Sequence, residues 1–160
     1  MRAARFDLAF ARHLAHNMTS TADSQPWRIE WRDGLSVRNT KIDDDHKELI
    51  ARVNDLNSGL VAQAGQAEVL QLMQRLLDVV ATHFAAEERT LRDCNYPELD
   101  AHKTAHARLT AEFRGAMDNF ARSPVSLTWL AKGLLISRAL MEHLAKDDML
   151  YRDFVTSAPP

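Results

Sequence analysis

A chain of 160 residues, with 46% hydrophobic and 26% charged side chains, has the size and composition of one globular domain, which excludes wholesale disorder. Its 20 basic and 22 acidic residues leave a net charge of -2, which excludes a general nucleic-acid binder, because such a protein needs an excess of positive charge. The single cysteine excludes an intramolecular disulfide, and no apolar run reaches the ~18 residues of a membrane span. We therefore expect a cytoplasmic protein.

Residues 1–26 differ from the rest of the chain and are expected to form an N-terminal tail and linker. Apolar residues recur there at helical spacing, but Arg12 and His13 interrupt them, so the segment is unlike a secretory signal. We expect a flexible or weakly helical tail. The next segment, residues 27–41, is expected to form an extended arm that turns at Asp33-Gly34.

Four stretches carry apolar residues in steps of three and four, which is typical of amphipathic helices. They cover about 43–64, 67–92, 97–122 and a last stretch from Ser123-Pro124 to about 154. Long helices joined by short turns pack as an up-down-up-down bundle. The sequence therefore predicts an all-α four-helix bundle over residues 27–155, followed by a C-terminal tail at 156–160.

Histidines occupy the apolar rows of all four predicted helices. Burying an imidazole without a partner is costly, so five of them require a common partner, and a shared metal is the economical one. These five are His46, His83, His102, His106 and His143.

Carboxylates join the histidines on the same rows. Glu87 follows His83 by four residues, and Asp147 and Asp148 follow His143. Five imidazoles and two carboxylates exceed the coordination of one ion, whereas two ions bridged by the carboxylates would use them all. The donor types suit Fe, Mn, Zn or Cu about equally.

Several short motifs match one known family in order and spacing. They are Ile42-Asp43-Asp44-Asp45-His46-Lys47 after the arm, His83-Phe84-Ala85-Ala86-Glu87-Glu88, Tyr96-Pro97 with His102 and His106, and His143-Leu144-Ala145-Lys146-Asp147-Asp148-Met149-Leu150-Tyr151. In these segments the chain resembles the hemerythrin family, and within it the bacterial hemerythrins. The likeness covers about residues 27–155.

The resemblance implies a non-haem di-iron centre that binds O2 reversibly. Carried over by position, one iron is held by His102, His106 and His143. The other is held by His46 and His83, which leave it an open position for O2. Glu87 and Asp148 bridge the two irons, together with an oxo or hydroxo group.

The last predicted helix offers two possible carboxylate ligands and lacks a tryptophan that the family usually has. On an ideal helix Asp147 is the simpler ligand, but the family spacing to Tyr151 selects Asp148, so Asp147→Ala is expected to be nearly silent. The family usually has a tryptophan four residues before the last histidine, where this chain has Ala139. A missing indole predicts a wider pocket or admitted water.

Three classes of function fit these residues. The first is O2 binding, or binding of another small diatomic ligand, for storage, delivery or sensing; sensing would require a partner chain. The second is a di-iron enzyme that reduces peroxide, O2 or nitric oxide. The third is iron buffering or a structural bundle. The site has no acid–base pair beyond the ligands themselves, which favours binding over catalysis.

Overall fold

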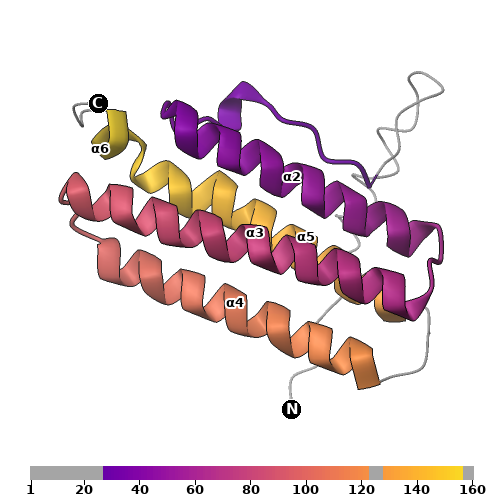
Figure 1. Cartoon of the computed structure of the whole chain (residues 1–160). Coiled ribbons are helices and arrows are strands. Elements are labelled where there is room, and N and C mark those ends of the chain that lie inside the picture. Colours follow the sequence, from indigo (N-terminus) through magenta and orange to yellow (C-terminus); the bar gives the residue numbers. More distant parts are fainter. Residues whose placement is uncertain (1–26, 123–127, 157–160) are drawn as a thin grey trace, which may run out of the picture.

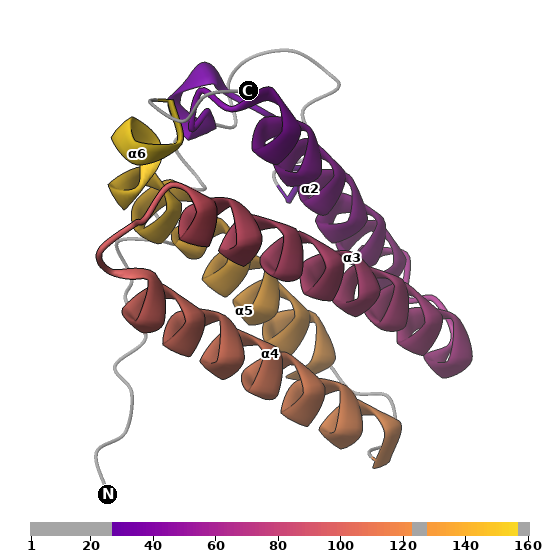
Figure 2. The ribbon, with the colours of Figure 1, turned by 60° about the vertical axis from the view of Figure 1, so that its left-hand side comes forward.

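The computed structural model describes residues 27–122 and 128–156, with side chains in the second range from Gly133 onward. Four long helices form a bundle: α2 (Thr40–Val61), α3 (Gln66–Asp93), α4 (Leu99–Arg122) and α5 (Thr128–Glu142). Helix α2 contacts α3 and α5, and α4 contacts the same two helices, so the four close into a ring (Figures 1 and 2). The predicted all-α four-helix fold is confirmed.

Three expectations fall partly or wholly outside these ranges. The N-terminal tail at 1–26, the Ser123-Pro124 start of the last helix and residues 157–160 lie outside the described residues. Thr156, assigned to the tail from sequence, ends the short helix α6 (Arg152–Thr156). Within the described ranges, none of the helices has both the length and the apolar character needed to cross a membrane.

Helix ends follow local capping. Helix α2 begins three residues before its expected start because the side chain of Asn39 accepts a hydrogen bond from the Ile42 N–H at 3.3 Å. It ends three residues early, and Gln63 beyond it has a positive φ of 53°. Helix α4 begins at Leu99, two residues after Pro97. Helix α3 agrees with the sequence to within one residue at each end.

The arm lies along α2 and is fastened by buried amides (Figure 1). Asn54 accepts from the Ile29 N–H and donates to the Ile29 carbonyl, both at 2.8 Å, and Asn57 donates to the Trp27 carbonyl at 3.1 Å. The expected turn is present as one 3-10 turn, η1 (Asp33–Leu35). These contacts explain why α2 carries two asparagines on its buried face.

The fourth helix differs from its prediction, which had it continuous to about residue 154. After α5 the chain forms a π-helical turn, η2 (His143–Asp147), then a 3-10 turn, η3 (Asp148–Leu150), and then α6. The Asp148 N–H donates to the His143 carbonyl, which is the five-residue hydrogen bond of a π-helix. The wider turn accommodates one extra residue, so position 148 faces the same side as position 143.

Apolar side chains form two clusters of unequal size. The larger fills the long part of the bundle and includes Leu56, Leu76, Val80 and Leu144. The smaller closes one end, where α6 meets the start of α2 and the end of α3, and consists of Val37, Ile42, Leu91, Tyr96, Tyr151 and Val155. Buried histidines and carboxylates lie between the two apolar clusters. We call this set the polar layer: His46, His83, Glu87, His102, His106, His143 and Asp148.

Candidate metal centre

The polar layer contains all seven residues that sequence and resemblance select. His46 comes from α2, His83 and Glu87 from α3, His102 and His106 from α4, and His143 and Asp148 from the π turn and its end. Each is at least 94% buried, and Asp148 and His46 are completely buried. Their donor atoms fall into two groups, one of Glu87, His102, His106, His143 and Asp148, and one of His46, His83 and Asp148.

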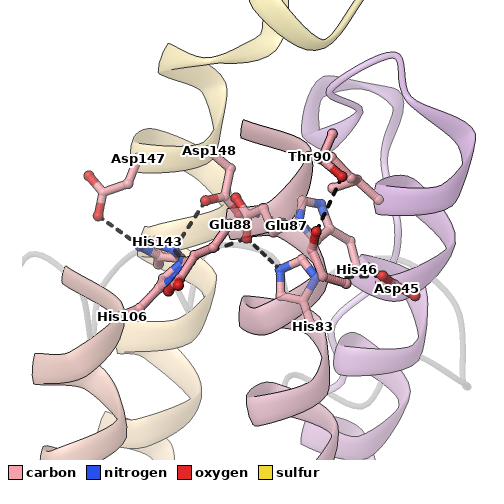
Figure 3. A network of polar contacts seen from close by, with 12 residues as sticks. Asp45, His46, His83, Glu87, Glu88, Thr90, His106, His143, Asp147 and Asp148 are labelled. Atoms are coloured by element: carbon pink, nitrogen blue, oxygen red, sulfur yellow. Dashed lines mark hydrogen bonds and ion pairs between the residues drawn. The ribbon is translucent and has the colours of Figure 1, made fainter. Parts of the chain in front are cut away.

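Each carboxylate uses its two oxygens in different directions. Glu87 places Oε1 at 3.0 Å from His102 Nε2 and Oε2 at 3.0 Å from His83 Nε2. Asp148 places Oδ1 at 3.1 Å from His143 Nε2 and Oδ2 at 3.2 Å from His46 Nε2. Both carboxylates therefore span the two histidine groups, and Figure 3 shows them between the rings.

Many of these close contacts are not hydrogen bonds. Among the described residues, both ring nitrogens of His46 and of His83, Oε2 of Glu87 and both oxygens of Asp148 are buried without a hydrogen-bond partner. By contrast, His106 Nε2 and His143 Nε2 lie within hydrogen-bond distance of each other, at 2.9 Å. Neighbouring donors on one metal ion, each ~2.1 Å from it, lie ~3 Å apart, so the spacing suits ions between these atoms.

Electrostatics in the layer keep both carboxylates ionised. Burial opposes the charge of Glu87, but the imidazoles of His102 and His83 outweigh it and hold its pKa well below the usual range. Burial and the nearby Glu87 charge likewise oppose ionisation of Asp148, but His143 and His46 lower its pKa overall. Two adjacent buried negative charges are a strong site for a cation.

The imidazoles of His106 and His143 respond in opposite ways. Burial lowers the pKa of His106 to about 4, so its ring is neutral at neutral pH and has a lone pair to donate. Burial also disfavours charge on His143, but Asp148 and Asp147 overcome it and raise its pKa to about 9. A metal must therefore displace a proton from His143.

Outer carboxylates contact the far nitrogens of three histidines. Asp147 Oδ2 lies 2.9 Å from His143 Nδ1, and Glu88 Oε1 lies 3.0 Å from His106 Nδ1. Asp45 Oδ2 is more distant, at 3.9 Å from His83 Nδ1. Such contacts fix the ring orientation and make the ligand more basic. Figure 3 shows Asp147 and Asp148 on opposite sides of His143.

The expectation that Asp147→Ala is nearly silent took Asp147 for an unengaged surface residue, whereas its carboxylate contacts His143. Although it is 43% exposed in its side chain, its carboxylate orients His143. The sequence contained the signal, because residues four apart on a helical face are neighbours. The contact of Glu88 with His106 was also not predicted, although Glu88 ends the motif that contains His83. A polar residue next to a candidate ligand carries no sequence signal that separates it from an ordinary surface residue.

Apolar groups separate the layer from water. Four apolar residues on the helical rows that carry the histidines are buried in the larger cluster: Leu49, Val53, Leu109 and Phe113. Phe84 stacks on His106, with ring centroids 3.6 Å apart and planes 5° from parallel. On the other side Tyr151 packs edge-on against His102 at 5.4 Å. Burial raises the pKa of Tyr151, as do Asp148 and Glu87, so its phenol keeps its proton.

Ala139 lies one turn before His143 and is partly buried. It lines a cavity of about 410 Å³ between α4 and α5, which is also bounded by Leu109, Phe113 and Leu140. None of the seven histidine and carboxylate residues of the polar layer lines this cavity, so a wider pocket at the metal site itself stays a prediction.

Residues 38–154 match the family model described as Hemerythrin HHE cation binding domain. The chain is similar to a bacteriohemerythrin of Pseudomonas aeruginosa, with 33% identity over 132 residues, covering 79% of this chain and 81% of the relative. It is 31% identical to a bacteriohemerythrin of Stenotrophomonas maltophilia over the same shares. In fold it resembles a crystal structure of wild-type hemerythrin, with a TM-score of 0.70, 23% identity and coverage of 81% and 98%.

Proposed function

The chain belongs to the hemerythrin family, and we propose that it acts as a non-haem di-iron protein that binds O2 reversibly. The observation that carries this proposal is the pair of buried carboxylates, each of which reaches both histidine groups with a different oxygen. That arrangement suits two adjacent cations and has no purpose in a purely structural bundle, where ionised groups at this depth would be costly. A cytoplasmic location is part of the proposal.

The assignment of ligands follows the two donor groups. His102, His106 and His143 would hold one iron, and His46 and His83 the other, with Asp148 common to both groups. Glu87 would be shared as well, because its two oxygens contact His102 and His83. The group with two histidines has fewer protein donors, so it is where a diatomic ligand would bind. When bound, two ferrous ions supply the two electrons that O2 takes up.

The surrounding residues do the remaining work. Asp147 and Glu88 hold the rings of His143 and His106 with their Nε2 atoms turned into the layer. The apolar clusters above and below keep water out, which hinders protonation and escape of reduced oxygen species. The protein thus binds, orients and shields, and no described side chain is placed for substrate acid–base chemistry.

Metal analysis with visible spectroscopy tests the proposal. We expect about two iron ions per chain, and a visible band that disappears on anaerobic reduction and returns in air. Glu87→Gln should lose iron, whereas Glu68→Gln, the same change at an exposed position of α3, should not. One zinc ion per chain in protein from iron-replete cells, with no iron, would contradict the proposal.

The cavity beside Ala139 favours a second candidate, a di-iron enzyme that reduces peroxide, O2 or nitric oxide. Water and small reactants in this cavity would lie one helical turn from His106 and His143, because Leu109 and Leu140 line it. Ala139→Trp should then slow the decay of the O2-induced band and reduce consumption of peroxide or nitric oxide. Equal decay in two equally metallated proteins would remove the support that Ala139 gives to this candidate.

A further inference from the structure

The cavity between α4 and α5 is a consequence of small residues on two facing helices. Gly115 and Ala116 on α4 and Ala139 on α5 line it. Helix α4 buries His102, His106, Leu109 and Phe113, but none of its residues from 114 to 122 is buried. The second half of α4 therefore leaves space against α5 that no described side chain fills.

The inner wall of the cavity adjoins the polar layer. Leu109 follows His106 by three residues, Leu140 precedes His143 by three, and Val80 precedes His83 by three. One helical turn rises ~5.4 Å, so a molecule in the cavity would lie one turn from three of the imidazoles. Val80 and Leu140 are 1% and 4% exposed, which makes this wall rigid and dry.

The chemistry of the lining selects the class of ligand. The walls are aliphatic and aromatic, and polar side chains enter at only two lining positions, Glu112 and Asn119, both exposed. Arg108 Nε lies 3.9 Å from Glu112 Oε1, but Arg108 is not part of the lining. An anionic ligand would meet a carboxylate at the mouth, whereas a hydroxyl or amine could donate to Glu112 or Asn119.

We propose that this cavity binds a small, mainly apolar organic molecule that carries one hydrogen-bond donor, with its ring or chain against Phe113 and Ala139 and its donor at Glu112. Its volume of about 410 Å³ is within the ~300–1,000 Å³ range of small-molecule sites. A much smaller apolar cavity of ~150 Å³ suffices for benzene. The site is distinct from the donor groups, and its binding does not depend on which ion occupies them.

Titration of the full, metal-loaded chain with phenol, benzylamine and benzoate tests the proposal, with amide and methyl chemical shifts as the readout. We expect saturable binding of phenol and benzylamine, no binding of benzoate, and shifts confined to residues around Val80, Phe113 and Ile136. Zinc-loaded protein serves for the same experiment, since it is diamagnetic and its readout is independent of activity.

Variants that fill the space provide the control. Ala116→Leu should weaken phenol binding by ~10-fold or more, because the added atoms occupy the ligand's volume. Ala111→Leu, the same change at an exposed position of α4 outside the lining, should not. Absence of saturable binding in the unaltered chain, equal binding of benzoate, or equal binding in both variants would overturn the proposal. Loss of phenol binding as the protein self-associates would assign the cavity to a second copy and overturn it as well.

Discussion

The consecutive residues Asp147 and Asp148 make different contacts in the polar layer. Asp148 is completely buried and shared between both donor groups, whereas Asp147 contacts only the outer nitrogen of His143. Since a carboxylate behind a ligating histidine fixes its orientation and basicity, we expect Asp147→Asn to weaken metal affinity by ~10–100-fold without abolishing the site. Competition with a chelator of known affinity measures this. Asp118→Asn, at an exposed position of α4, is the control, and equal affinities in the two variants would contradict the role of Asp147.

The raised pKa of His143 gives a prediction about pH. In the metal-free protein this pKa is about 9, above the ordinary 6.5, so the bound proton stabilises the fold fully below pH 6.5 and this contribution is lost as the pH rises through about 9. Metal uptake has the opposite trend, because the ion competes with that proton. We expect zinc affinity to increase from pH 7 to pH 9, with proton release visible in a weakly buffered titration. An affinity independent of pH over this range would contradict the assignment.

The π turn determines which of the two aspartates faces the other donors of the polar layer. An ideal α-helix would turn position 147 toward the face of His143, and the five-residue hydrogen bond from Asp148 to His143 brings position 148 there instead. Nothing in the apolar pattern marks this turn, because periodicity reports which residues are buried and not the width of one helical turn.

Other elements were accessible from sequence. The apolar rows predict all four helices and place the five histidines inward, since a buried row is set by residue type alone. Both ends of α2 were misplaced, because Asn39 at its start and Gln63 beyond its end act through capping and backbone conformation, which periodicity does not register. Residues of the outer contacts, such as Glu88, could not be recognised until the helices were packed, because their role depends on the orientation of a neighbouring ring.

Helix contacts yield a prediction about two glycines. A Cβ on Gly133 of α5 would collide with Leu60 Cδ1 of α2, whereas a Cβ on Gly115 of α4 would meet nothing within 4 Å. Gly115→Ala should stabilise the fold by up to ~1 kcal/mol through helix propensity. Gly133→Ala gains the same propensity but must displace Leu60, at a cost of ~1–3 kcal/mol. Urea unfolding measures the free energy of unfolding of both variants, and Gly115→Ala should be the more stable. A more stable Gly133→Ala would contradict the prediction.

On the scale of the whole molecule, the polar layer makes stability depend on metal. Four helical elements place ionised carboxylates and unpaired imidazole nitrogens in one buried layer. An ion that binds only the folded state adds stability in proportion to the logarithm of its concentration, ~2.7 kcal/mol at 100 times its dissociation constant. We therefore expect chelation to lower the Tm, and added Fe²⁺ or Zn²⁺ to restore it. Thermal unfolding with and without chelator measures the effect, and an unchanged Tm would show that the layer is stable without ions.

The order of the donors along the chain has a consequence for biosynthesis. His46 comes first, and Asp148, which both groups share, comes last. When only α2 and α3 have emerged from the ribosome, the nascent chain presents His46, His83 and Glu87. It still lacks Asp148 and the two histidines of α4. A site that needs Asp148 to hold both ions cannot be complete before the π turn has left the ribosome. Until then, His46, His83 and Glu87 form an incomplete site that can bind whichever metal ion is in excess in the cell.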